Sequence, residues 1–294
     1  MAKGGSLIHQ ERREFGSAEH DVAAVVSVAQ VDQGLPGKAG QGGGFLGGAG
    51  PGYAARAARA RGAHVAAIDL SADMLACARL ADPLLSLVRA DAGTLPVAGG
   101  AFTAVVAGFF LPHLADPAAG TAELARALAP GGWLAVSIWD APARARHTGL
   151  LADAIADVTG TPPPTPAVPA GRLRELLQAA GLDHAECSTL RWVHPVPSAQ
   201  ALWDGLLASP VAAAAAVLRA TPAIQRRIRE RFLTLAAALT DAGGTVRLPV
   251  SAVISAAQRP PAHGPRGYRP TTAASAPQAS GLMLWLSRKM LSGS

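Results

Sequence analysis

Strand-like and helix-like patterns alternate through residues 45–140, and this alternation restricts the fold more than any other feature of the 294-residue chain. Three short apolar segments are typical of buried strands: His64–Asp69, Phe102–Leu111 and Trp133–Trp139. Helix patterns separate them, with Ser71 and the pair Asp116-Pro117 as expected helix starts. Parallel strands need a crossover connection, usually a helix, so the pattern predicts an α/β fold: a doubly wound, mostly parallel sheet with helices on both faces.

The sequence outside residues 45–140 does not continue this regular alternation. Residues 1–45 contain one strand-like run, Val22–Val31, followed by a glycine-rich stretch, and we expect a flexible N-terminal segment. Residues 46–259 are expected to form the main domain, with a ligand-binding core over 46–140 and a helical region with late strands over 141–259. A late strand is expected at Thr245–Ala257, where Pro249 favours a sheet edge or a break. Residues 260–294 are predicted to be a disordered basic tail.

Composition excludes several classes of protein. Two cysteines, Cys77 and Cys187, are too few for a disulfide scaffold or a thiolate zinc cage. No apolar run reaches the roughly 18 residues of a membrane span, and the N-terminus lacks the apolar stretch of a secretory signal, so we expect a cytoplasmic protein with no integral membrane association. Of the net charge of +6, the last 35 residues contribute +4, and this distribution argues against a nucleic-acid partner.

A glycine-rich turn precedes the first helix pattern of the core. Gly48, Ala49, Gly50 and Gly52 stand just before the helix pattern Tyr53–Arg61, where backbone N–H groups could hold an anionic or polar ligand. The surrounding text is so rich in glycine that other registers also fit. Gly42, Gly44 and Gly47 match a GxGxxG dinucleotide fingerprint, and a plain flexible linker remains an alternative.

Two aspartates follow successive strands. Asp69 ends its strand 17 residues after Gly52, close to the spacing of about 20 residues at which an acid meets a ribose diol. Asp91 ends the third strand, where a carboxylate could accept a hydrogen bond from an adenine amine. A strand-end acid that faces solvent or caps a helix is the alternative for each one. Together with the glycine turn, they lie where open α/β sheets bind ligands.

These segments resemble the Rossmann-like class I S-adenosylmethionine-dependent methyltransferases, in particular the small-molecule branch of ubiquinone and menaquinone type. The resemblance covers roughly residues 46–140, and it includes the segment FTAVVAGFFLPHLADP and the turn Leu128-Ala129-Pro130-Gly131-Gly132. It implies S-adenosyl-L-methionine as cofactor and a small-molecule acceptor. The residues to which it assigns cofactor contacts are Gly48, Ala49, Gly50, Gly52, Asp69, Leu70, Asp91, Ala92 and Ala107.

The chain departs from the family pattern at three positions. Leu46 stands where the family has an acid two residues before the first glycine, and that acid commonly helps to hold the methionine ammonium group. Thr103 replaces the fourth-strand acid, and Pro112 occupies a position that is often histidine. The departure at Leu46 bears directly on whether the cofactor is bound.

Methyl transfer asks for alignment, exclusion of water and sometimes a base for the acceptor. His113 follows the fourth strand and is the candidate base, with His147 and His194 as weaker ones, while local packing is the alternative for His113. The aromatic residues that could line an acceptor pocket are Phe109, Trp139, Trp192 and Trp203. No set of residues shows the spacing of metal ligands.

Three hypotheses follow from the sequence. The first is a methyltransferase that acts on a small organic acceptor and uses the region after residue 140 to shape the acceptor site. The second is a nicotinamide-dependent oxidoreductase that uses another glycine register, and Asp91 and the Pro-Gly-Gly turn argue against it. The third is a catalytically inactive protein with the methyltransferase fold. The oligomeric state is not predicted.

Overall fold

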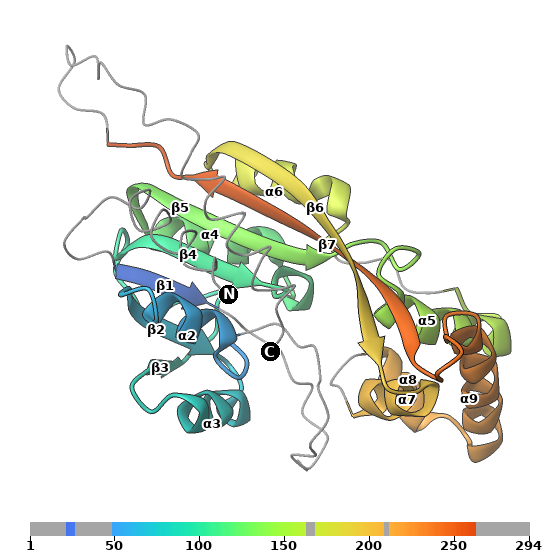
Figure 1. The fold of residues 1–294 in the computed structure, drawn as a ribbon. Coiled ribbons are helices and arrows are strands. Elements are labelled where there is room, and N and C mark those ends of the chain that lie inside the picture. The colour runs from blue at the N-terminus through green and yellow to red at the C-terminus, as the bar shows by residue number, and fades with distance from the viewer. Residues whose placement is uncertain (1–21, 27–48, 163–167, 209–211, 263–294) are drawn as a thin grey trace, which may run out of the picture.

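A computed structural model describes residues 22–26, 49–162, 168–208 and 212–262 of the chain (Figure 1). Seven strands among these residues form one sheet in the order β3-β2-β1-β4-β5-β7-β6. The strands are β1 (Val22–Val26), β2 (His64–Asp69), β3 (Ser86–Arg89), β4 (Phe102–Gly108), β5 (Leu128–Trp139), β6 (Asp183–Val196) and β7 (Val246–Gln258). The first five are parallel, whereas β7 runs antiparallel to both β5 and β6. The predicted Rossmann-like, mostly parallel α/β sheet is confirmed.

Helices connect the parallel strands, except that a loop without a helix leads from β3 to β4. The α-helices of the described residues are α2 (Tyr53–Arg59), α3 (Ala72–Ala81), α4 (Pro117–Ala127), α5 (Arg146–Thr159), α6 (Leu173–Ala179), α7 (Ala199–Leu207), α8 (Ala212–Arg219) and α9 (Pro222–Ala237). Two short 3-10 helices are η1 (Leu111–His113) and η2 (Ala170–Arg172). The expected caps are present, because the Ser71 hydroxyl accepts a hydrogen bond from the Met74 N–H and the Asp116 carboxylate accepts from Ala118 and Ala119.

The alternation of side chains along the strands distributes helices to both faces of the sheet. On β4, Val105 and Ala107 join the largest apolar core, which also includes Leu124 of α4 and Leu173 of α6. On β2, Ala67 points to the opposite face, where a smaller core contains Ala55 of α2 and Ala78 of α3. Successive side chains of a strand point to opposite faces, so α4 and α6 cover one face and α2 and α3 the other.

A second apolar core lies beyond the end of the parallel sheet. The buried members of this core include Leu150 of α5, Trp203 of α7, Val217 of α8 and Phe232 of α9. The strands β6 and β7 extend past β5 and reach these helices (Figure 1). We call α5, α7, α8 and α9 the helical lobe. All four helices follow residue 140 in the chain.

Pro249 lies in the part of β7 that pairs on one side only, where the sheet tolerates a proline. β7 pairs with β5 from Ala252 to Gln258, so this part lies inside the sheet. Pro249 precedes that part and pairs only with Val193 of β6, which leaves it at a local edge. The missing N–H of proline therefore removes no ladder hydrogen bond to β5. The long strand β6 was not predicted, because only part of Asp183–Val196 alternates between polar and apolar residues.

The sheet also includes a strand from the first 45 residues. β1 lies between β2 and β4, with Val22 opposite His64 and Val25 opposite Val106. The architecture thus uses a segment that precedes the expected domain start at residue 46. The expected tail, residues 260–294, lies almost wholly outside the described residues, and so do Gly42, Gly44, Leu46 and Gly48.

Candidate functional site

The glycine turn, residues 49–52, leads directly into α2. Ala49, Gly50 and Gly52 are buried, and the Gly52 N–H donates to the Ala49 carbonyl at 2.6 Å, which closes the turn. Gly50 and Gly52 have φ of 49° and 81°, a backbone conformation that residues with a Cβ rarely adopt. A Cβ on Gly52 would also lie 3.1 Å from the Cβ of Ala78. Glycine is therefore required at position 52 for both conformation and space.

Asp69 joins this turn to the carboxyl end of β2. One carboxylate oxygen accepts a hydrogen bond from the Gly50 N–H at 3.1 Å, and the other accepts from the Ser71 N–H at 2.8 Å. The Asp69 side chain is completely buried. The two groups that the sequence predicted to act together, the glycine turn and the first strand-end acid, are thus in direct contact.

Asp91 follows the neighbouring strand and is exposed. Its carboxylate accepts from the Gly93 N–H at 2.8 Å, which shapes the loop after β3. Asp69 pairs with Arg89 in the β2–β3 ladder, so Asp91 lies two residues beyond the partner of Asp69 at the same sheet edge. The loop is fixed farther along by Glu123 and Arg126 of α4, which bond the Leu95 N–H and the Val97 carbonyl.

Three other predicted cofactor contacts contribute mainly to the core. Ala92 and Ala107 are completely buried in the largest apolar core, and Leu70 is half-buried against it. Since the Ala92 and Ala107 side chains pack inward, a ligand at the sheet edge would meet their backbone atoms. These residues thus lie in or against the apolar core next to the candidate site.

His113, the candidate base, lies in η1 just after β4. Its backbone N–H donates to the Phe110 carbonyl at 2.9 Å, so η1 fixes its position on the carboxyl side of the sheet. Partial burial lowers the pKa of the imidazole below its usual range. A neutral imidazole at physiological pH can accept a proton.

An aromatic cluster continues this edge beyond β4, and we define it as Phe109, Trp139, His147 and Trp192. The rings of Phe109 and Trp139 stack with centroids 3.9 Å apart, and the His147 imidazole meets Trp139 edge-on at 4.1 Å. The ring centroid of Trp192, in β6, lies 6.3 Å from that of Trp139. Three of the four aromatic residues named from the sequence as pocket candidates are thus together, whereas Trp203 packs with Phe232 in the helical lobe.

The backbone of Phe109 is strained to place its ring in this cluster. Its φ of 55° lies in the left-handed region, which is unusual for a bulky residue. The Phe109 N–H donates to the Ser137 carbonyl at 2.8 Å and lies 3.2 Å from the Ser137 hydroxyl oxygen. The sequence analysis missed Ser137, although a single polar residue inside the apolar strand WLAVSIW is a signal that could have identified it.

His147 is the most confined titratable group of the cluster. The side chain is buried, and neither ring nitrogen has a hydrogen-bond partner in the described part of the chain. Burial and the nearby His194 lower the pKa of His147 to about 4. The imidazole is therefore neutral at physiological pH, with one N–H donor and one nitrogen acceptor.

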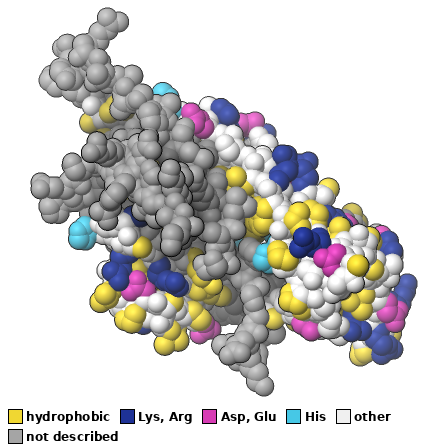
Figure 2. All heavy atoms as spheres, in the orientation of Figure 1, with side chains coloured by type: hydrophobic (Ala, Val, Ile, Leu, Met, Phe, Trp, Pro, Cys, Tyr) yellow, Lys and Arg dark blue, Asp and Glu magenta, His cyan; other side chains and the backbone are white. Residues whose placement is uncertain are grey.

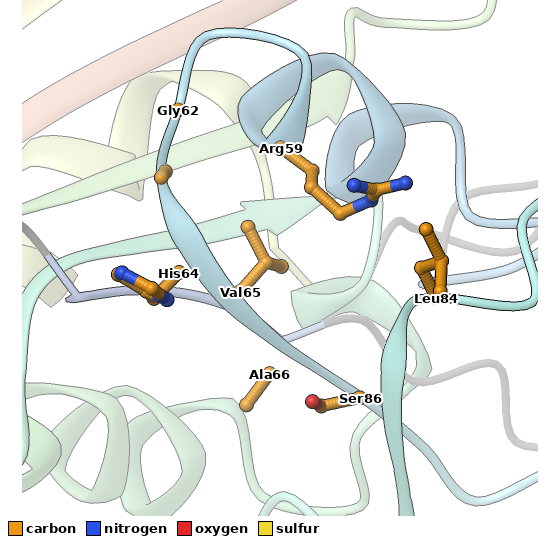
Figure 3. A pocket seen from close by; sticks show the side chains of 8 residues that line it. Arg59, Gly62, His64, Val65, Ala66, Leu84 and Ser86 are labelled. Carbon is orange, nitrogen blue, oxygen red and sulfur yellow. The ribbon is translucent and has the colours of Figure 1, made fainter.

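The hollow shown in Figure 3 lies away from these residues. It has a volume of about 540 Å³ and is lined by Arg59 of α2, the amino ends of β2 and β3, and the residues just before those strands. The candidate site lies at the opposite, carboxyl edge of the sheet. Arg59, the cation of the hollow, is paired with Asp82 at 2.9 Å.

Among the described residues, no group of three or more histidine, cysteine or acidic side chains is arranged to hold a metal ion. A search of the same residues finds no helix with the length and apolar character needed to cross a membrane. In the view of Figure 2, basic and acidic side chains are interspersed over the helical lobe.

Comparison with known proteins finds matches to part of the parallel core. Residues 47–136 match the family model described as a methyltransferase domain. The demethylmenaquinone methyltransferase of Clavibacter sepedonicus is 38% identical over 97 residues, which are 32% of this chain and 40% of the relative. That of Mycolicibacterium vanbaalenii is 41% identical over 81 residues, 28% of this chain and 35% of the relative. The matched part of the chain thus spans well under half the length of these relatives.

Solved structures support the fold over a longer range. A protein from Bacillus halodurans assigned as a methyltransferase superposes with a TM-score of 0.52 at 16% identity, covering 87% of this chain and all of that one. YcgJ from Bacillus subtilis gives 0.50 at 14% identity, with coverage of 87% and 97%. Residues 47–136 of this chain are therefore similar to methyltransferase domains, including those of demethylmenaquinone methyltransferases, and the solved structures share its fold.

Proposed function

We propose that this chain is an S-adenosyl-L-methionine-dependent methyltransferase that transfers a methyl group to a small organic acceptor. The observation that carries the proposal is the contact between the Gly50 N–H and the Asp69 carboxylate at the carboxyl edge of the sheet. It joins the turn and the strand-end acid within the segment that matches the methyltransferase family model. The names of the relatives add support, because both are demethylmenaquinone methyltransferases.

The residues present fit the cofactor along this edge. Gly50 and Gly52 give the turn the left-handed backbone that brings the Gly50 N–H to Asp69, and Asp91 offers an exposed carboxylate to an amine. A carboxylate oxygen accepts more than one hydrogen bond, so ribose hydroxyls can add to the N–H groups on Asp69 or replace them. Because Asp69 has no exposed surface, we expect the glycine turn to shift when the ribose binds.

The cofactor supplies an activated methyl group on a positively charged sulfur, so the protein has to align the acceptor, exclude water and accept a proton. The half-buried, neutral His113 is the proposed proton acceptor. The aromatic cluster continues the same edge of the sheet, and we assign it to the acceptor side. The helical lobe packs against Trp139 and Trp192, so it would limit the size of the acceptor.

Calorimetric titration with S-adenosylhomocysteine and, separately, with NADH tests the proposal. We expect micromolar binding of S-adenosylhomocysteine and no binding of NADH. Binding of NADH alone would contradict the proposal and favour an oxidoreductase. Mass spectrometry of any ligand retained through purification gives an independent answer.

A substitution at Leu46 distinguishes two hypotheses: an active enzyme and an inactive protein of the same fold. The variant Leu46→Asp restores the acid that the family has before its first glycine. We expect it to strengthen S-adenosylhomocysteine binding, with Leu46→Asn as the uncharged control. If neither the parent nor Leu46→Asp binds the compound, the chain is a non-catalytic member of the family.

A further inference from the structure

His147 has an unusual environment for a histidine that only fills space. The residue is 9% exposed, and neither ring nitrogen has a hydrogen-bond partner in the part of the chain that the structure describes. A buried polar group without a partner costs about 1–3 kcal/mol, and a neutral imidazole has both a donor and an acceptor to satisfy. Such groups in a native structure call for an explanation, and a ligand is one.

The location of His147 indicates which ligand. Its ring contacts Trp139, which stacks on Phe109, and Phe109 directly follows the carboxyl end of β4. The rings of Phe109 and Trp139 thus form a continuous path from the proposed methyl-transfer edge to the His147 imidazole. Phe109, Trp139 and Trp192 are each half-buried, so part of their surface remains available for contact with a flat apolar molecule.

The charge state of His147 distinguishes its role from that of a base. Burial holds its pKa well below that of an ordinary histidine, so an imidazolium at this position would readily lose its proton. His194 of β6 is the titratable group that acts on it electrostatically, and a second positive charge there would oppose protonation further. With this lowered pKa, the neutral imidazole can still accept a hydrogen bond, but it is a weak base.

We propose that His147 is a binding residue for the methyl acceptor, whose hydroxyl group donates a hydrogen bond to the imidazole while its flat apolar part packs on the aromatic cluster. This inference rests on the proposed function and adds a specificity-determining residue to it. Both nitrogens are buried, so a side chain next to the imidazole has to move before the acceptor hydroxyl can reach it. An acceptor that lacks the hydroxyl would leave the imidazole unpartnered and should bind less well.

Two probes that differ only in this donor test the proposal: 1-naphthol and 1-methoxynaphthalene. Their dissociation constants are measured by NMR on the full chain with [13Cε1]-histidine and saturating S-adenosylhomocysteine. The His147 resonance is assigned by its loss in His147→Gln. We expect the parent protein to bind 1-naphthol about tenfold more tightly, and only 1-naphthol should shift the His147 resonance strongly.

The variants separate a binding role from a packing role. His147→Phe should bind both probes equally, and His147→Gln, which retains an acceptor, should recover part of the preference. His64→Gln, an exposed position at the opposite edge of the sheet, should leave the preference unchanged. Equal loss of affinity for both probes in His147→Phe, a preference retained in that variant, or no binding of either probe to the parent would overturn the inference.

The outcome is distinct from that of the proposed function. Binding of S-adenosylhomocysteine should be the same in the parent and in all three variants. A parent that binds the naphthol with the expected preference but not S-adenosylhomocysteine contradicts the methyltransferase proposal alone. A parent that binds S-adenosylhomocysteine without any preference for the naphthol contradicts only the role of His147.

Discussion

At the β2 end of the sheet edge, a carboxylate and backbone N–H groups make the contacts, whereas at the β5 end the contacts are between aromatic rings. The first region is local in sequence, because Gly50 and Asp69 are 19 residues apart. The second brings together Phe109, Trp139 and Trp192 from three different strands or strand ends. A local polar motif suits a ligand shared by a whole family, while side chains from distant segments can vary with the acceptor.

Asp140 tests how much the β5 end depends on one polar group. Its carboxylate is buried and accepts from the Ala141 N–H, the Ser251 hydroxyl and Arg144, which together fasten the end of β5 to β7. Asp140→Ala should lower the free energy of unfolding by about 3 kcal/mol, since it strands these partners. Urea denaturation measures the change.

Asp153 offers the matched control, because it pairs with Arg146 at 2.8 Å while its side chain is 40% exposed. We expect Asp153→Ala to cost about 0–1 kcal/mol. Similar losses in the two variants would show that the fastening of β5 to β7 contributes little.

His147 at the aromatic end should make the free energy of unfolding depend on pH. Its pKa is lowered to about 4 in the folded protein, against about 6.5 in an unfolded chain. Above pH 6.5 both states are neutral and nothing is lost. As the pH falls from 6.5 to 4, the unfolded state takes up the proton first, so up to about 3 kcal/mol of stability is lost.

Urea denaturation at pH 7.5, 6, 5 and 4.5 measures this loss in the parent and in His147→Phe. The variant should lose less stability at acid pH, while His64→Gln should follow the parent. Burial also lowers the pKa of His113 and His194, so part of the acid sensitivity remains in the variant. Parallel curves for the parent and His147→Phe would contradict the prediction.

A substitution of Asp69 tests the polar end of the candidate site, at the carboxyl edge of the sheet. Asp69→Ala should weaken S-adenosylhomocysteine binding by about 2 kcal/mol, or roughly thirtyfold, because it removes the acceptor of the Gly50 N–H and the proposed acceptor of the ribose hydroxyls. Calorimetry measures the dissociation constant, and circular dichroism confirms the fold. Asp73→Ala, an exposed position in the first turn of α3, should bind as the parent does. An unchanged constant for Asp69→Ala would refute its assigned role.

The strained backbone of Phe109 gives the smallest expected effect. Both Phe109→Ala and Phe109→Gly lose the stacking on Trp139, but only glycine adopts the φ of 55° without strain. The glycine variant should therefore be more stable than the alanine variant by about 1 kcal/mol. Thermal denaturation of the two variants measures the difference. If alanine is the more stable, the backbone at this position is not under strain.

The sequence predicted the polar end of the site better than the aromatic end, for a physical reason. β2 was predicted with its bounds, and the helix starts at Ser71 and Asp116 were right, because caps and apolar runs act over a few neighbouring residues. The contact between Gly50 and Asp69 follows from the same rules, since a turn and a strand end on adjacent elements share one edge.

The aromatic end required information that no local pattern contains. Trp139 and Trp192 come together because β7 enters between β5 and β6, and the missed strand β6 hid that arrangement. Trp203 has the same residue type as its two counterparts, yet it packs in the helical lobe. Composition therefore suggested which side chains could line a pocket, while topology determined which of them come together.

The insertion of β7 between β5 and β6 also has a consequence for biosynthesis. Both neighbours precede β7 in the chain, so each leaves the ribosome with an open row of hydrogen-bonding groups that waits for a partner. The sheet can be completed only after Gln258 has emerged, near the end of the described chain. Until then β5 and β6 are the segments most exposed to pairing with another molecule, and chaperones that shield strand edges should act at this stage.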